Sequence, residues 1–120
     1  MSYSGSCHCG AITFTVDADL PGEAISCNCS HCRRKGLLLT FVPRAALTID
    51  TGGDTGGEGL AEYRFNTRKI AHMFCPACGC EPFAHGTAPD GKETASINLR
   101  CVPAADLDAL RIKPFDGASR

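Results

Sequence analysis

The sequence of 120 residues lacks a long hydrophobic run and lacks an excess of charge of either sign. Its longest nearly apolar run, residues 37–42, is far too short for a membrane-spanning helix, which needs about 20 apolar residues. The net charge is -1, so no general surface for nucleic acid or another polyanion is indicated. The first residues carry neither the basic stretch nor the apolar segment of a signal peptide. We therefore expect a cytoplasmic protein without nucleic-acid or membrane partners.

Long amphipathic helical patterns and internal repeats are also absent, and short apolar stretches separated by Gly, Pro and Asp recur instead. Strands are expected over 7–16, 24–26, 37–42 (buried on both faces), 45–50, 60–66, 69–74, 83–86 and 94–102, and one or two helical turns over 103–110. The glycine-rich segment 51–59 is expected to be a flexible hairpin tip, with a mobile lid as the alternative. The sequence predicts a mainly β fold in one small domain.

Cysteine is the residue present in excess, at nine of 120 residues. A small protein uses so many cysteines either for disulfides or for metal binding. A cytoplasmic protein keeps its thiols reduced, and nine is an odd number. Metal binding is therefore the favoured interpretation.

Three cysteines stand together in Cys27-Asn28-Cys29-Ser30-His31-Cys32, with the spacing C-x-C-x2-C. Residues i and i+2 of an extended segment point to the same side, and a turn after Cys29 could bring Cys32 to the same point. Three thiolates leave one tetrahedral position of a divalent ion open, which is typical of a catalytic zinc. The basic run that follows, Arg33-Arg34-Lys35, is either a solvated face or a partner for a substrate carboxylate.

A second set of cysteines lies in Cys7-His8-Cys9-Gly10 and Cys75-Pro76-Ala77-Cys78-Gly79. The second of these segments has the pattern of a zinc knuckle, whose tight turn presents N–H groups to the sulfurs and whose glycine permits a positive φ. In a strand beginning at Cys7, Cys7 and Cys9 would share a face. Together with Cys75 and Cys78 they would form a closed, structural site that joins distant segments.

Two alternatives remain open from the spacing. Cys75 and Cys78 could be a redox pair, although the glycine that follows does not favour the helix which such a pair normally opens. A protein ligand could also close the three-cysteine site, which would make both metals structural and the protein an interaction module. The candidates for that ligand are Cys80, His31 and His8. Core, structural or solvated roles are expected for Cys101, His72 and His85.

Together these motifs resemble the glutathione-dependent formaldehyde-activating enzyme family, to which the centromere protein V domain also belongs. The resemblance is carried by GSCHCG at 5–10, CNCSHCR at 27–33, FCPACG at 74–79, NLRC at 98–101 and FDG at 115–117, within a domain from residue 4 to residue 117. It implies a β-tent fold of small antiparallel sheets with two zinc ions per chain. The structural zinc would be held by Cys7, Cys9, Cys75 and Cys78, and the catalytic zinc by Cys27, Cys29 and Cys32.

The resemblance also implies an activity, the condensation of formaldehyde with glutathione to S-hydroxymethylglutathione, which is a carbon–sulfur lyase reaction in reverse. The catalytic zinc would receive the thiolate or the carbonyl oxygen at its open position. Arg33, Arg34 or Lys35 would pair with a glutathione carboxylate, and His31 is the nearest candidate for a general base. The alternative function is a non-catalytic zinc-binding or glutathione-binding interaction module.

Overall fold

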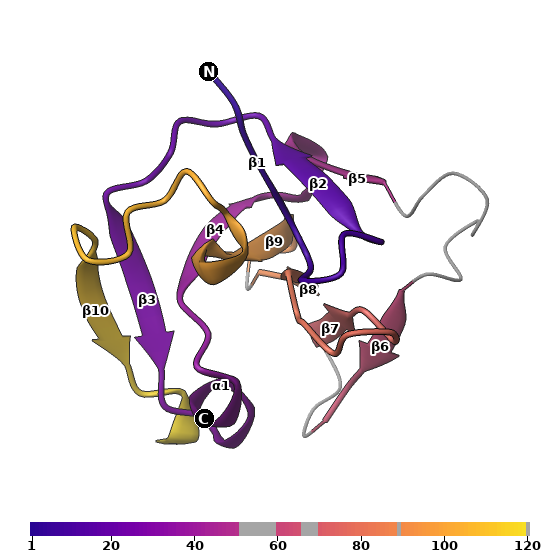
Figure 1. Ribbon diagram of the computed structural model, residues 1–120. Helices are drawn as coiled ribbons and strands as arrows, with labels where there is room; N and C mark the ends of the chain where they lie inside the picture. The colour runs from indigo at the N-terminus through magenta and orange to yellow at the C-terminus, as the bar shows by residue number, and fades with distance from the viewer. Residues whose placement is uncertain (51–59, 66–69, 89, 120) are drawn as a thin grey trace.

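The computed structural model describes residues 1–50, 60–65, 70–88 and 90–119 (Figure 1). Its strands are β1 (Tyr3–Ser6), β2 (Thr13–Val16), β3 (Glu23–Cys27), β4 (Leu39–Pro43), β5 (Leu47–Asp50), β6 (Ala61–Tyr63), β7 (Ile70–Phe74), β8 (Phe83–Thr87), β9 (Glu93–Asn98) and β10 (Arg111–Phe115). The helix α1 spans Ser30–Lys35, and 3-10 turns lie at Arg44–Ala46, Leu99–Cys101 and Gly117–Ser119. The predicted hairpin tip or lid over 51–59 lies outside the described residues. In the parts that are described, no helix is long and apolar enough to cross a membrane.

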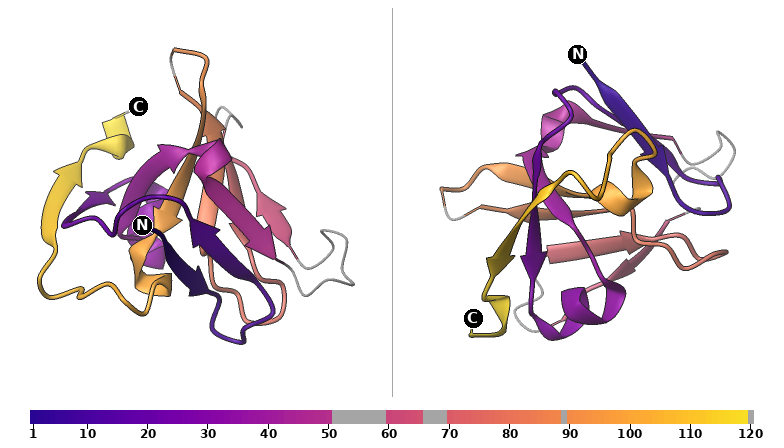
Figure 2. Two further views of the ribbon diagram at one scale, coloured as in Figure 1. Left: turned by 90° about the horizontal axis from the view of Figure 1, so that it is seen from above. Right: turned by 60° about the vertical axis from the view of Figure 1, so that its left-hand side comes forward.

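The predicted mainly β class is confirmed. One sheet has the strand order β1-β2-β5, and the other has the order β10-β3-β4-β9-β8-β7-β6. Neighbouring strands pair antiparallel except β10, which runs parallel to β3 along the outer edge of the larger sheet (Figure 2).

The edge strand β10 was not predicted from the sequence, where the last expected element is one or two helical turns over 103–110. All residues of β10 are exposed, so no buried face produced an alternating pattern that could be recognised. Pro114 is tolerated there because an edge strand leaves one row of backbone groups unpaired. The segment 103–110 forms turns instead of a helix.

The expected strand over 7–16 is wrong in its first half. The chain forms a hairpin, in which β1 and β2 pair antiparallel and the cysteines lie in the connecting turn. The Cys7 N–H donates to the Ile12 carbonyl at 3.0 Å, and the Gly10 N–H donates to the Cys7 carbonyl at 3.2 Å. Cys7 and Cys9 therefore converge through a tight turn and not through the alternation of a strand.

Two further strands differ from expectation. Phe41 is 52% exposed, so β4 is not buried on both faces. The strand expected over 94–102 ends at Asn98, because the Asn98 side chain accepts a hydrogen bond from the Arg100 N–H at 3.1 Å and starts a 3-10 turn. Consequently Ile97, Leu99 and Cys101 do not share one strand face.

The core lies between the two sheets. In β2, Phe14 and Val16 are buried whereas the threonines that alternate with them are exposed. Phe14 packs edge-on against Phe83 of the larger sheet, with ring centroids 5.7 Å apart. Ile97 and Leu99 are fully buried in the same cluster. This apolar contact fixes how the small sheet sits against the large one.

The short helix and the C-terminal segment lie side by side, far from the N-terminus (Figures 1 and 2). The helix begins after Cys29, whose sulfur accepts a hydrogen bond from the Cys32 N–H at 3.3 Å. It ends at Gly36, whose N–H donates to the Cys32 carbonyl at 2.9 Å. The Arg100 Nε donates to the Gly36 carbonyl at 2.7 Å and ties this end of the helix to the turn after β9.

Candidate metal centres and the cavities beside them

The first cysteine cluster consists of Cys7, Cys9, Cys75 and Cys78, whose sulfur atoms all lie within 4.8 Å of one another. The Cys9 sulfur is 3.6 Å from that of Cys7 and 3.6 Å from that of Cys75. Four thiolates at about 2.3 Å from a tetrahedral zinc stand roughly 3.8 Å apart. The cluster therefore fits a zinc ion with four protein ligands and no open position.

Two tight turns build this four-cysteine cluster. The Gly79 N–H donates to the Cys75 carbonyl at 2.8 Å, and Gly79 has a φ of 82°, the positive value that the knuckle requires. In the other turn the Ile12 N–H donates to the Cys7 sulfur at 3.4 Å. No helix follows Cys78, since the chain passes from this turn into β8. The geometry is that of a metal knuckle and not of a redox pair.

The thiols of this cluster interact strongly. Hydrogen bonds from the backbone of Cys80 and of Cys9 lower the pKa of Cys78 to about 5, so this sulfur is a thiolate at neutral pH. The backbone of Ala11 would lower the pKa of Cys9, but the Cys75 and Cys7 thiols outweigh it and raise this pKa to about 11. A bound cation removes this conflict because it stabilises every ligand as a thiolate.

The second cysteine cluster consists of Cys27, Cys29 and Cys32, whose sulfur atoms also lie within 4.8 Å of one another. Cys27 is the last residue of β3, Cys29 caps α1, and Cys32 lies in the first turn of the helix. The turn that the sequence suggested is therefore a helical one. Among the described residues, no fourth ligand joins this group. The set fits a metal ion with one position open to a ligand from outside.

The surroundings of Cys29 and Cys32 shift their pKa values in opposite directions. Burial acts to raise the pKa of Cys29, but hydrogen bonds from the Cys32 N–H and from neighbouring groups outweigh it and lower this pKa. Burial raises the pKa of Cys32. The Cys29 thiol therefore loses its proton more readily than the Cys32 thiol.

The C-terminal segment packs directly against the three-cysteine cluster, and Asn28 holds it there. The Asn28 Nδ2 donates to Asp116 Oδ1 at 3.1 Å, and its Oδ1 accepts from the Ala118 N–H at 2.9 Å. A Cβ atom on Gly117 would clash with the Cys27 sulfur. The FDG sequence at 115–117 therefore forms one wall of this cluster, and its glycine is needed for close approach.

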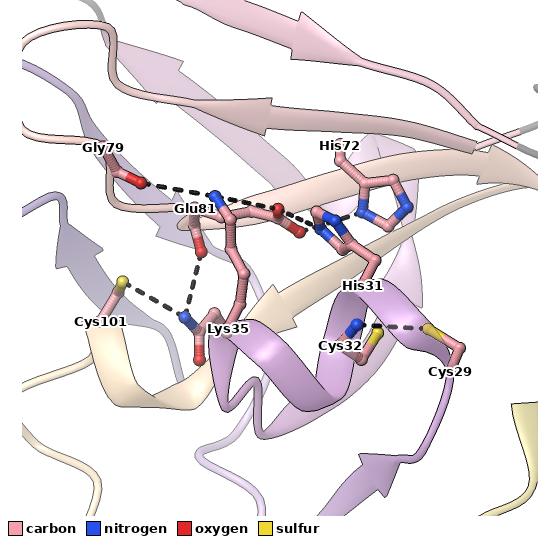
Figure 3. A network of polar contacts seen from close by, with 9 residues as sticks. Cys29, His31, Cys32, Lys35, His72, Gly79, Glu81 and Cys101 are labelled. Carbon is pink, nitrogen blue, oxygen red and sulfur yellow. Dashed lines mark hydrogen bonds and ion pairs between the residues drawn. The ribbon is translucent and has the colours of Figure 1, made fainter. Parts of the chain in front are cut away.

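A cluster that the sequence did not reveal lies beside the three cysteines (Figure 3). The carboxylate of Glu81 is placed between two imidazoles, with Oε1 2.7 Å from His31 Nε2 and Oε2 3.0 Å from His72 Nδ1. The Lys35 Nζ lies 3.8 Å from Oε1, and the Glu81 side chain is only 3% exposed. The Asn98 Nδ2 donates to the Glu81 carbonyl at 3.0 Å and fixes its backbone.

His31, His72 and Glu81 also lie close enough to hold a cation. Both carboxylate oxygens already have an imidazole partner, and Lys35 supplies a positive charge, so the hydrogen-bonded arrangement is satisfied without a metal. Burial acts to raise the pKa of Glu81, but the hydrogen bonds from His72 and His31 outweigh it and lower this pKa. Burial lowers the pKa of His31, against the opposing effect of Glu81. Glu81 is therefore ionised at neutral pH and acts as an acceptor.

A cavity of about 360 Å³ opens beside the three cysteines, and Cys27, Cys29, Cys32 and His72 all line it. His72 Nδ1 donates to the Glu81 carboxylate, so in a neutral imidazole the acceptor is the other ring nitrogen, Nε2. His72, expected to be structural or solvated, thus lies at the cavity. No spacing rule relates it to Glu81, because the two meet only when β7 and β8 pair. The one feature of the sequence that could have pointed to Glu81 is the presence of an acidic residue between the knuckle and the apolar strand β8.

A second cavity of about 350 Å³ adjoins the first, and Phe65 lines both. Ser30, His31, Arg34, Lys35 and Tyr63 complete its lining. The predicted carboxylate partner Arg34 is placed here, with its Nη1 donating to the Ser30 carbonyl at 2.8 Å. The other predicted partner, Arg33, is exposed and lines neither of these two cavities.

Among the described residues, none of the side chains considered as a fourth ligand joins the group of Cys27, Cys29 and Cys32. The Cys80 thiol has a hydrogen bond from the backbone of His8, which places both beside the four-cysteine cluster. The Nε2 of His31 is occupied by Glu81. Cys101, expected in the core, is partly buried, and burial raises its pKa to about 11.

Comparison with known proteins agrees with this geometry. A family model described as glutathione-dependent formaldehyde-activating enzyme matches residues 2–114. Among solved structures, the crystal structure of a Rhodobacter sphaeroides protein is similar, with 30% sequence identity and a TM-score of 0.71. The similarity covers 92% of this chain and 99% of that one.

Proposed function

The chain belongs to the glutathione-dependent formaldehyde-activating enzyme family, and on that premise we propose that it catalyses the reversible addition of a thiol to an aldehyde. With glutathione and formaldehyde the product is S-hydroxymethylglutathione, and the reverse direction is a carbon–sulfur lyase reaction. The main support is the cavity in which three cysteines with no further described ligand meet His72. We propose one domain over residues 4–117, in the cytoplasm, where thiols stay reduced.

We propose zinc as the cofactor, with two ions per chain. Cys7, Cys9, Cys75 and Cys78 would hold the structural ion, and Cys27, Cys29 and Cys32 would hold the catalytic ion. Sulfur-only ligand sets favour zinc among the common divalent metals. A zinc ion on the three cysteines supplies a Lewis acid to whichever reacting group occupies its remaining position.

The residues of the chain would handle the proton. In the addition, the sulfur forms a bond to the carbonyl carbon, the π pair moves to the oxygen, and the proton that leaves the thiol ends on that oxygen. His72 lines the cavity, and its Nδ1–H would donate to Glu81, which would leave Nε2 of the neutral ring to accept the proton. We therefore assign the general base to His72 in preference to His31, because His72 lines the cysteine cavity whereas His31 lines the adjoining one.

The charged ends of glutathione would bind outside the cysteine cavity. Arg34 and Lys35 line the adjoining cavity, and a guanidinium and an ammonium group suit carboxylates. Arg33 remains a predicted partner of a carboxylate, from the exposed face of α1. Phe65 lies between the two cavities and would contact a tripeptide that spans both.

The test is NMR exchange spectroscopy of glutathione with formaldehyde, with and without the zinc-loaded chain. We expect the adduct to exchange faster with the protein present, and the Cys29→Ser variant to return the rate to background. If protein with two zinc ions binds glutathione without accelerating exchange, the non-catalytic glutathione-binding module replaces the enzyme. If the protein neither binds glutathione nor accelerates exchange, the family reaction is excluded for this chain.

A further inference from the structure

We propose that the cysteine cavity accepts a carbonyl compound with an apolar substituent, such as a medium-length aliphatic chain or a phenyl ring, in preference to formaldehyde. This inference rests on the proposed thiol addition and names the substrate class for it. Six apolar side chains line the cavity: Ile25, Leu39, Phe41, Phe65, Ile70 and Phe115. The polar lining that the structure describes consists of the three cysteines, His72 and Ser96, with no Asp, Glu, Lys or Arg side chain.

The size of the cavity also favours a carbonyl compound with an apolar substituent. Its volume of about 360 Å³ lies in the range of small-molecule sites, about 300–1,000 Å³. A water molecule takes up about 30 Å³ of the liquid, and formaldehyde has only two non-hydrogen atoms. Formaldehyde would leave most of the cavity to water held against apolar walls. A substituent of about five or six carbon atoms would replace much of that water with apolar contacts.

The exposure of the lining supports a ligand as well. Phe41 is 52% exposed, Ile70 is 50% exposed, and Phe115 is 43% exposed. They come from β4, β7 and β10, three strands far apart in sequence that bring their apolar side chains to one opening. Large apolar groups gathered around a concave site mark binding surfaces, because water covers them unfavourably. An apolar substituent removes this surface from water.

The two cavities differ in the polarity of their lining, and each suits one of the two reactants. The carboxylates of a charged thiol find Arg34 and Lys35 in the adjoining cavity. The same carboxylates placed in the cysteine cavity would lose water without a Lys or Arg side chain in the described lining to replace it, which is costly. The apolar cavity is thus left for the substituent of the carbonyl partner. The bonds formed and broken are the same as in the addition to formaldehyde, and the product is a thiohemiacetal that carries the apolar group.

Two measurements on the zinc-loaded full chain test this inference. The first compares acceleration of glutathione exchange with formaldehyde, hexanal and benzaldehyde, each relative to its own uncatalysed rate. We expect at least tenfold greater acceleration for hexanal and benzaldehyde. The second titrates unreactive 1-hexanol and follows the ¹H–¹⁵N spectrum. We expect shifts concentrated at the amides of Phe41, Ile70 and Phe115.

A matched pair of variants assigns the effect to the cavity. Ile70 and Ile112 are both half-exposed isoleucines on strands, 50% and 46%, but only Ile70 lines the cavity. Ile70→Ser should weaken hexanol binding at least fivefold and reduce hexanal acceleration, whereas Ile112→Ser should leave both unchanged. Equal losses in the two variants would overturn the assignment.

The possible failures are distinguishable. If formaldehyde is accelerated as strongly as hexanal, the apolar preference is overturned and the proposed function stands. If no aldehyde is accelerated, the proposed function fails, and the hexanol titration alone decides whether the cavity binds apolar ligands. If hexanol does not perturb the three cavity amides, the inference is overturned whatever the rates.

Discussion

The two cysteine clusters contain the same ligand atom in different structural settings. The four-cysteine cluster joins residues 66 positions apart, since Cys9 and Cys75 face each other across the two sheets. The three-cysteine cluster comes from six consecutive residues. A metal that joins distant segments strongly restricts the unfolded chain, whereas one held by neighbouring residues restricts it little. The first cluster is therefore suited to hold the fold, and the second is suited to chemistry.

Each cluster contains both buried and more exposed cysteines, since Cys9 is exposed and Cys32 is buried, so the clusters differ in their surroundings. Cys7 and Cys75 are 2% and 1% exposed and belong to the main core. Cys27 and Cys29 are partly exposed, beside a cavity. Glu81 connects the two regions, because it follows the knuckle in sequence and contacts His31 between two ligands of the other cluster. The following predictions test this contrast, from the largest expected effect to the smallest.

Removing one ligand of the four-cysteine cluster should destroy the fold. Structural zinc in finger peptides binds with about 10–16 kcal/mol, which is comparable with the whole stability of a domain, about 5–15 kcal/mol. We expect Cys75→Ser to lose the cooperative thermal transition in circular dichroism. A folded Cys75→Ser protein that retains a single zinc ion would show that this cluster does not hold the structure together.

Removing one ligand of the three-cysteine cluster should spare the fold and abolish activity. Serine is a favoured N-cap residue, so Cys29→Ser keeps the cap of α1 and should cost less than about 1 kcal/mol. Metal analysis should find one zinc ion in place of two, and exchange acceleration should fall to background. Global unfolding of this variant would contradict the contrast between the clusters.

Weakening the contacts of Glu81, which connects the regions of the two clusters, should lower the stability by an intermediate amount. Glu81→Gln removes a buried charge that accepts from two imidazoles, at a cost of about 1.5–3 kcal/mol at neutral pH. The pKa of Glu81 is lowered in the fold, so its contribution is present above the unfolded pKa and is lost as pH falls through the folded pKa. Urea unfolding should therefore give a wild-type-to-variant difference that shrinks below about pH 4.

A separate readout distinguishes positioning of His72 from mere stability. If Glu81 holds the His72 Nδ1–H tautomer, the ¹⁵N signals of that ring should shift toward a mixture of tautomers in Glu81→Gln, and the exchange rate should fall in parallel. Unchanged His72 signals with an unchanged rate would remove Glu81 from the proposed mechanism.

The smallest effect is expected at the wall of the three-cysteine cluster. In Gly117→Ala the new methyl group meets the Cys27 sulfur, so zinc affinity at this cluster should fall by about 10–100-fold with little change in stability. Competition with a chromogenic chelator measures it. Gly22→Ala is the control, because a Cβ there meets no atom within 4 Å. Equal affinities in the two variants would mean that the C-terminal segment yields without disturbing the ligands.

Much of the fold and of the cysteine grouping could be predicted from the sequence. The partition into two clusters follows from the spacing of the cysteines. The three-cysteine cluster lies within the stretch Cys27 to Cys32, and each half of the four-cysteine cluster is a cysteine pair followed by a glycine. Most strands follow from apolar alternation. The exceptions have physical reasons: the Cys7 turn is closed by backbone hydrogen bonds, and β10 buries no face that could leave a pattern.

The sequence by itself determined the family, the mainly β class and the sulfur atoms that meet within each cysteine motif, because each depends on residue types at short, fixed spacings. Tertiary structure alone decided that Glu81 lies between His31 and His72, that Gly117 touches Cys27, and that apolar side chains from three strands surround the cysteines. These contacts join segments that are separate in the chain. They exist only after the sheets pair and the core fixes their positions.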